Sequence, residues 1–98
     1  MEYLQEITAK FKSAIASGPT PDKSLKIDMK GVGLVVVTST NVSNEDLDAD
    51  TTIVIARKDF EALVAGKLNP PAAFMQGKIK IKGDPAAALK WLPIIQRT

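Results

Sequence analysis

The chain has 98 residues, a length that favours one domain (residues 1–98) with a single hydrophobic core. It contains neither cysteine nor histidine, which excludes disulfides, Cys/His metal sites and the Ser-His and Cys-His pairs of nucleophilic catalysis. Hydrophobic residues make up 45% of the sequence and charged residues 24%, and the formal net charge is +2, values typical of a folded globular protein.

The first half of the chain predicts a helix followed by a pair of strands. Residues 3–16 carry apolar side chains at helical spacing and predict an amphipathic helix that ends at Gly18-Pro19. Residues 25–30 alternate apolar and charged side chains, which predicts a half-buried strand. Residues 31–33 permit a turn because they contain two glycines, and the β-branched residues 34–38 predict the partner strand.

The middle of the chain changes from strand to helix patterns. The polar segment 41–50 has room for a short edge strand, and residues 51–56 predict a strong strand because most of them are β-branched. Residues 57–66 predict a helix that stops at a glycine. Residues 69–77 predict a helix of one or two turns, with asparagine as the cap and proline in the first turn.

The last quarter predicts a strand and a final helix. Isoleucine and lysine alternate strictly in residues 78–82, as in a strand with one apolar and one charged face. Asp84-Pro85 predicts the start of a helix whose apolar face contains Ala88, Leu89, Leu92 and Ile95. A proline at position 93 is expected to kink or end this helix. The order of elements predicts an α+β fold, with one sheet face toward solvent and the other against the helices.

The two ends of the chain carry no recognisable targeting signal. Residues 1–6 show no basic start followed by an apolar run, so we expect no secretory signal peptide. The longest apolar run, residues 34–37, is far shorter than the roughly 18 to 20 residues that cross a bilayer. The last residues also lack a Ser-Lys-Leu peroxisomal address. These features predict a cytoplasmic protein.

Three alternating carboxylates, Asp46, Asp48 and Asp50, resemble the first ligands of a calcium loop. Such a loop needs glycine at its sixth position and glutamate at its twelfth, where this sequence has Thr51 and Arg57. No apolar wall is expected beside these carboxylates to shift a pKa for acid/base work. We therefore interpret the segment as a solvated loop and expect no metal site.

Four lysines, Lys67, Lys78, Lys80 and Lys82, form a basic stripe. Nucleic-acid binding is not expected, because the net charge is low and no aromatic residue is interleaved to stack on bases. The stripe fits a solvated sheet face, and it also fits a site for acidic lipid head groups or a transient contact with a membrane surface.

Three segments between residues 49 and 92 carry the most specific pattern of the sequence. They are residues 66–70 (Gly-Lys-Leu-Asn-Pro), 73–78 (Ala-Phe-Met-Gln-Gly-Lys) and 81–84 (Ile-Lys-Gly-Asp). With this spacing the chain resembles the sterol carrier protein 2 family. The opening helix and the first hairpin resemble that family with less specificity.

The resemblance implies a mostly antiparallel five-stranded sheet, with helices covering one face and an apolar tunnel between them. It implies binding and transfer of a lipid such as a fatty acid, fatty acyl-CoA, sterol or isoprenoid-like ligand, with no covalent catalysis and no cofactor. Two alternatives remain open from the sequence. One is an accessory module that presents a lipid substrate to a partner enzyme, and the other is an interaction domain without a ligand.

The ligand is expected to lie between the helices and a floor of strand isoleucines. A short helix carrying Phe74 and Met75 forms one wall and the last helix forms the other, with the entrance near Pro93. Gln76 is the nearest polar group to a ligand head group, and a solvated surface glutamine is the alternative. The predicted lipid-binding residues are Phe11, Ile15, Ile53, Ile55, Phe60, Phe74, Met75, Gln76, Ile79, Ile81, Leu89, Leu92 and Ile95.

Overall fold

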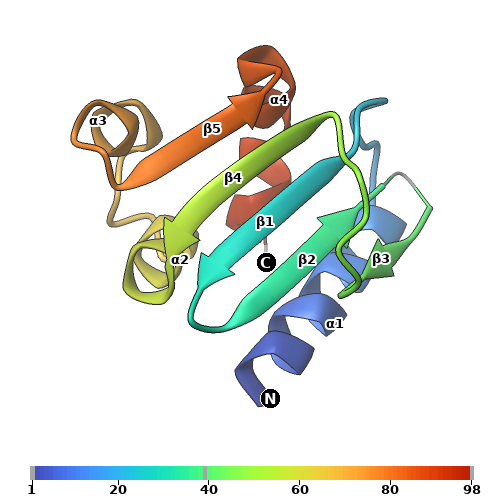
Figure 1. Cartoon of the computed structure of the whole chain (residues 1–98). Coiled ribbons are helices and arrows are strands. Elements are labelled where there is room, and N and C mark those ends of the chain that lie inside the picture. Colours follow the sequence, from blue (N-terminus) through green and yellow to red (C-terminus); the bar gives the residue numbers. More distant parts are fainter. Residues whose placement is uncertain (1, 39, 98) are drawn as a thin grey trace.

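The computed structural model describes residues 2–38 and 40–97, which form an α+β fold with one sheet (Figure 1). The helices and strands follow closely the order that the sequence predicts. They are α1 (Glu2–Ala16), β1 (Leu25–Lys30), β2 (Gly33–Val37), β3 (Val42–Ser43), β4 (Thr51–Ala56), α2 (Arg57–Val64), α3 (Pro70–Met75), β5 (Ile79–Gly83) and α4 (Pro85–Arg97).

The five strands form a single sheet in the order β3-β2-β1-β4-β5. Three of the four strand pairs are antiparallel, and the pair of the central strand β1 with β4 is parallel. The expected α+β class and the mostly antiparallel five-stranded sheet are thus confirmed. The parallel pair joins segments far apart in the sequence, because β2, β3 and a long loop lie between β1 and β4.

Hydrogen bonds between Ser24 and Asp50 fix the entry to the parallel pair. The Asp50 carboxylate accepts from the backbone N–H of Ser24 at 2.8 Å and from its hydroxyl at 3.1 Å, and the Ser24 hydroxyl oxygen accepts from the Asp50 N–H at 2.9 Å. These two hydrogen bonds to the carboxylate, first the one from the backbone, hold the pKa of Asp50 below its ordinary value of 3.8. The pairing of β1 with β4 therefore begins next to this set of hydrogen bonds, which we call the Ser24–Asp50 clasp.

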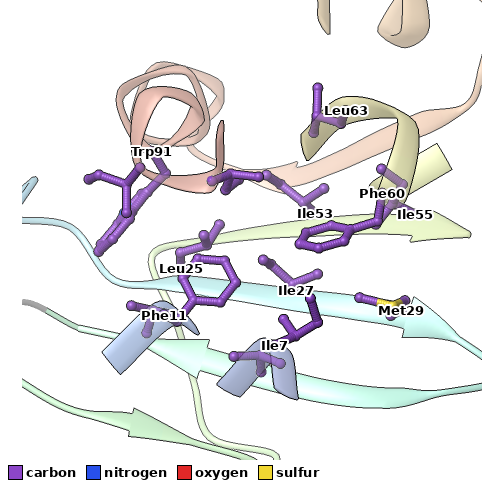
Figure 2. Close-up of a cluster of buried hydrophobic side chains, with 14 of the residues drawn as sticks. Ile7, Phe11, Leu25, Ile27, Met29, Ile53, Ile55, Phe60, Leu63 and Trp91 are labelled. Carbon is purple, nitrogen blue, oxygen red and sulfur yellow. The ribbon is translucent and has the colours of Figure 1, made fainter. Parts of the chain in front are cut away.

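One face of the sheet carries the hydrophobic core, and Figure 1 shows α1 and α4 behind that face. Strand residues alternate in direction, so β1, β2 and β4 each present one set of mainly apolar residues to the helices, which insert Phe11, Phe60 and Trp91 among them. The close-up in Figure 2 shows these side chains filling the space between sheet and helices. The centre of the molecule is therefore packed with side chains.

Helix α4 differs from its predicted form in two ways. It continues through Pro93 to Arg97, so the residues after the proline do not leave the helix. Burial of Ile94 and Ile95 in the core holds this last turn in place. The buried face is also rotated from the expected one, because Trp91 is fully buried and Leu89 is exposed. The Trp91 indole Nε1 donates to the backbone carbonyl of Lys23 at 2.7 Å, which satisfies its polar atom.

The opposite face of the sheet carries most of the charged strand residues and is partly covered by the segment between β3 and β4, which passes in front of the sheet in Figure 1. Val36 lies buried on this side, and Lys26 pairs with Asp46 at 2.7 Å. Asp46, Asp48 and Asp50 are exposed here. Among the residues that the structure describes, no group of three or more carboxylates is arranged to hold a metal ion.

Candidate functional site

An apolar groove of about 330 Å³ lies at the β5 edge of the sheet, between α3 and α4. It differs from the packed centre because several of its large side chains are open to solvent. Eleven residues line it: Ile53, Pro70, Pro71, Phe74, Met75, Ile79, Ile81, Pro85, Ala88, Leu89 and Leu92.

Helix α3 forms the first wall. Asn69 caps it by accepting a hydrogen bond from the Ala72 N–H at 3.5 Å, and prolines occupy its first two positions, where a backbone N–H is not needed. Ala73 anchors the helix by its complete burial. The next two residues, Phe74 and Met75, are then exposed on the groove side of a helix only six residues long.

The floor comes from the inner face of the last two strands of the sheet. Ile53 of β4 lies opposite Ile81 of β5 in the antiparallel register, and Ile79 lies two residues before Ile81 on the same face. All three line the groove. The floor of the groove is thus a continuation of the surface that forms the core beneath β1 and β4.

The second wall is the flank of α4. Its buried face, with Ala87, Trp91 and Ile94, points to the core, so Leu89 and Leu92 are turned toward the groove. Ala88 completes the wall and is itself buried. One side of α4 therefore packs in the core, and another side lines the groove.

The lining of the groove is apolar. None of the eleven lining residues has a polar side chain. Among the described residues, two groups have shifted pKa values, Tyr3 and Asp50, and neither lines the groove. Burial and the nearby Glu61 raise the pKa of Tyr3, whose ring also lies 3.9 Å from the Arg57 guanidinium carbon. The arrangement offers apolar surface rather than an acid, a base or a nucleophile.

The structure brings seven of the thirteen predicted lipid-binding residues together at the groove. Four others lie in the packed core, do not line the groove, and are almost completely buried. The seven are Ile53, Phe74, Met75, Ile79, Ile81, Leu89 and Leu92, and the four in the core are Phe11, Ile55, Phe60 and Ile95.

The remaining two predicted residues lie elsewhere. Gln76 is the exposed C-cap residue of α3, just after the groove wall, and does not line the groove. Ile15 is partly buried beside a second hollow of about 290 Å³, lined in part by polar residues such as Lys12 and Asn41. This second hollow lies at the end of α1, on different elements from the apolar groove.

Four lining residues were absent from the predicted set, namely Pro70, Pro71, Pro85 and Ala88. Each proline stands at the beginning of a helix, so the sequence pattern marks it as a local stop or start signal rather than as a contact surface. The sequence did contain a signal for them. Pro70 and Pro71 share a short helix with Phe74, and Pro85 and Ala88 lie within one helical turn of Leu89.

Comparison with known proteins identifies the family of the chain. Residues 1–96 match the model of the SCP-2 sterol transfer family. The chain is 37% identical over 91 residues to human sterol carrier protein 2, covering 91% of this chain and 16% of the human protein. It is 34% identical over 96 residues to non-specific lipid-transfer protein-like 1 of Caenorhabditis elegans, covering 96% of this chain and 75% of the relative.

The fold is also that of a solved sterol carrier protein. The chain superimposes with a TM-score of 0.76 and 20% identity on sterol carrier protein 2 of Aedes aegypti in complex with the C16 fatty acid palmitate, covering 94% and 93% of the two chains. The fold thus defines a sterol carrier protein 2 domain. The family match over residues 1–96 shows further that this chain belongs to the SCP-2 sterol transfer family.

Two facts bear on the wider setting of the domain. The chain spans only 16% of the length of the sterol carrier protein 2 relatives that it matches, so this domain also occurs as part of longer proteins. Within the part of the chain that the structure describes, no helix has the length and hydropathy to span a membrane.

Proposed function

We propose that the chain binds the hydrocarbon part of a lipid in the groove between α3, β5 and α4 and transfers it without covalent chemistry. The observation that carries the proposal is the distribution of exposed large hydrophobic residues. Among the described residues there are four, and three of them, Phe74, Met75 and Leu89, line this one groove. Family membership and the palmitate complex of the mosquito relative support lipid as the ligand class.

The size of the groove favours a single acyl chain. A cavity of about 150 Å³ binds benzene, so a volume of 330 Å³ accommodates roughly a dozen carbon atoms. A fatty acid or fatty acyl-CoA can place this length of chain inside and keep its polar head in water. A whole sterol, with about twice as many carbon atoms, would project from the groove.

Binding of fluorescent acyl probes of increasing length tests the proposal. Each buried methylene contributes about 0.8 kcal/mol, so affinity should rise about fourfold per carbon. The rise should level off near the length that fills the groove. Equal, weak binding of short and long probes would contradict the proposal.

Two substitutions locate the site, and a third serves as their control. Met75→Gln and Leu92→Gln place an amide against the bound chain and should weaken binding about tenfold, since a polar group without a partner beside hydrocarbon costs about 1 to 3 kcal/mol. Leu47→Gln makes the same kind of change at an exposed leucine that does not line the groove. Its affinity should match that of the wild-type protein, and an equal loss in all three variants would place binding elsewhere.

A second candidate function is an accessory module that holds a lipid substrate for a partner enzyme. It is favoured by the presence of the domain within much longer relatives. Transfer of a pyrene-labelled fatty acid between two vesicle populations separates the two functions. A free-standing carrier accelerates this transfer alone, whereas an accessory module binds the probe but needs its partner to release it.

A further inference from the structure

The groove lies in the part of the chain that carries the positive charge. Residues 62–98 contain five lysines and one arginine but a single acidic residue, Asp84, and so have a net charge of +5. Residues 1–61 contain seven basic and ten acidic residues and have a net charge of −3. All the lining residues of the groove except Ile53 belong to the basic part.

Strand β5 carries both lysines of this basic part and isoleucines of the groove floor. Its isoleucines, Ile79 and Ile81, form the groove floor, while Lys80 and Lys82 alternate with them on the other face of the same edge strand. Lys78 precedes the strand and follows the turn after α3. All three lysines are exposed, and no described acidic side chain forms an ion pair with them. Their long side chains can extend past the edge of the sheet.

We infer that the rim of the groove docks on an anionic lipid bilayer, with Lys78, Lys80 and Lys82 against the head groups and Phe74, Met75 and Leu89 entering the interface. The inference rests on the proposed function, because a lipid then passes between bilayer and groove without crossing water. An exposed apolar patch bordered by unpaired lysines has the composition of a membrane-surface site.

No other described surface combines both features. The exposed side of α1 carries Gln5, Glu6, Lys10 and Lys12, and none of the exposed large hydrophobic residues is on this helix. Leu47, the fourth exposed large hydrophobic residue, lies among Glu45, Asp46 and Asp48, whose charge would be repelled by an anionic surface. The apolar and basic features coincide at α3, β5 and α4.

Flotation with vesicles tests the inference on the full chain. The wild-type protein should float with vesicles of phosphatidylcholine and phosphatidylserine, float much less with phosphatidylcholine alone, and dissociate as sodium chloride is raised. A triple variant, Lys78→Gln/Lys80→Gln/Lys82→Gln, should bind the anionic vesicles on the order of 100-fold more weakly, from about fivefold for each lysine. A matched variant, Lys10→Gln/Lys12→Gln/Lys23→Gln, changes the net charge equally and should bind like the wild type.

Uptake of a neutral probe, a pyrene-labelled long-chain alcohol, without vesicles separates the two proposals. Wild type and both triple variants should take it up equally, since none of the substituted lysines lines the groove. A wild-type protein that takes up no probe overturns the proposed function and this inference with it. Normal uptake with equal loss of vesicle binding in both variants, or with loss only in the Lys10 variant, overturns the docking alone. A dimer that covers Met75 and competes with vesicles would also overturn the docking alone.

Discussion

The same residue types are found in two opposite environments in this molecule. Phe11, Met29 and Leu25 in the core are exposed by 0%, 1% and 0%, whereas Phe74, Met75 and Leu89 at the groove are exposed by 51%, 85% and 57%. The difference in exposure comes from how completely the helices cover the sheet. Beneath β1 and β4 the helices α1, α2 and α4 close over the sheet, while beside β5 a six-residue helix leaves the surface open. How far the helices extend over the sheet, rather than residue type, therefore separates the core from the open groove.

The largest difference in the free energy of unfolding is expected between Phe11→Ala in the core and Phe74→Ala at the groove. Phe11→Ala leaves a cavity in a filled core and should lower the free energy of unfolding by about 3 to 5 kcal/mol. Phe74→Ala removes a half-exposed ring and should cost less than about 1 kcal/mol, because little surrounding structure depends on it. Urea unfolding, followed by fluorescence of the single tryptophan, Trp91, measures both values. Similar losses would show that α3 is part of the core.

The methionine pair tests polarity instead of volume. Met29→Gln buries an amide without a partner and should cost about 1 to 3 kcal/mol, whereas Met75→Gln should stay within about 0.5 kcal/mol of the wild type. Acyl-probe affinity should show the reverse order, with the larger loss for Met75→Gln. A Met29→Gln protein as stable as the wild type would mean that the core admits water.

The Trp91 hydrogen bond tests α4, the helix that contributes to both the core and the groove. Trp91→Phe keeps an aromatic ring but removes the donor to the Lys23 carbonyl, and should lower the free energy of unfolding by about 1 to 2 kcal/mol. Probe affinity should not change, because Trp91 does not line the groove. Urea unfolding followed by circular dichroism is the measurement, and an altered probe affinity would show that the two faces of α4 are coupled.

The smallest effect is expected at the Ser24–Asp50 clasp, which belongs to neither region. Hydrogen bonds from Ser24 lower the pKa of Asp50 from 3.8, so its contribution to stability is present above that value and is lost as the pH falls through the lowered pKa. Asp50→Asn should therefore be slightly less stable than the wild type at neutral pH and equal to it in strong acid. Thermal unfolding across this pH range checks the sign, and a difference that grew in acid would contradict it.

Most of the fold was predictable because local patterns decide it. Alternation in residues 25–30 and 78–82, caps such as Asn69, and stops such as Gly66 gave the elements and their order. The burial pattern of α4 was not predictable from periodicity. This helix has alanine, leucine, tryptophan or isoleucine at most positions, so its apolar surface extends most of the way around, and only packing against the sheet selects Trp91 over Leu89 as the buried residue.

The position of the groove was predictable in part for the same reason. The flanking Pro71 and Gly77 mark the short helix of Phe74 and Met75, whose few backbone hydrogen bonds indicated a wall at the surface. The strand pattern predicts that Ile53 and Ile55 share one face, but it does not show how far the helices extend over that face. In the structure Ile53 reaches the groove, whereas Ile55 lies under the helices.

The parallel pairing of β1 with β4 has a consequence for how the chain folds. The hairpin of β1 and β2 is local, but β4 returns to β1 only after 26 residues, and β5 then pairs with β4. Closing such a loop costs chain entropy before any contact compensates for it. The groove, built almost wholly from residues 70–92, should then assemble last. Substitutions such as Phe74→Ala should therefore change the unfolding rate in stopped-flow experiments and leave the refolding rate unaltered, whereas slower refolding would place α3 in the folding nucleus.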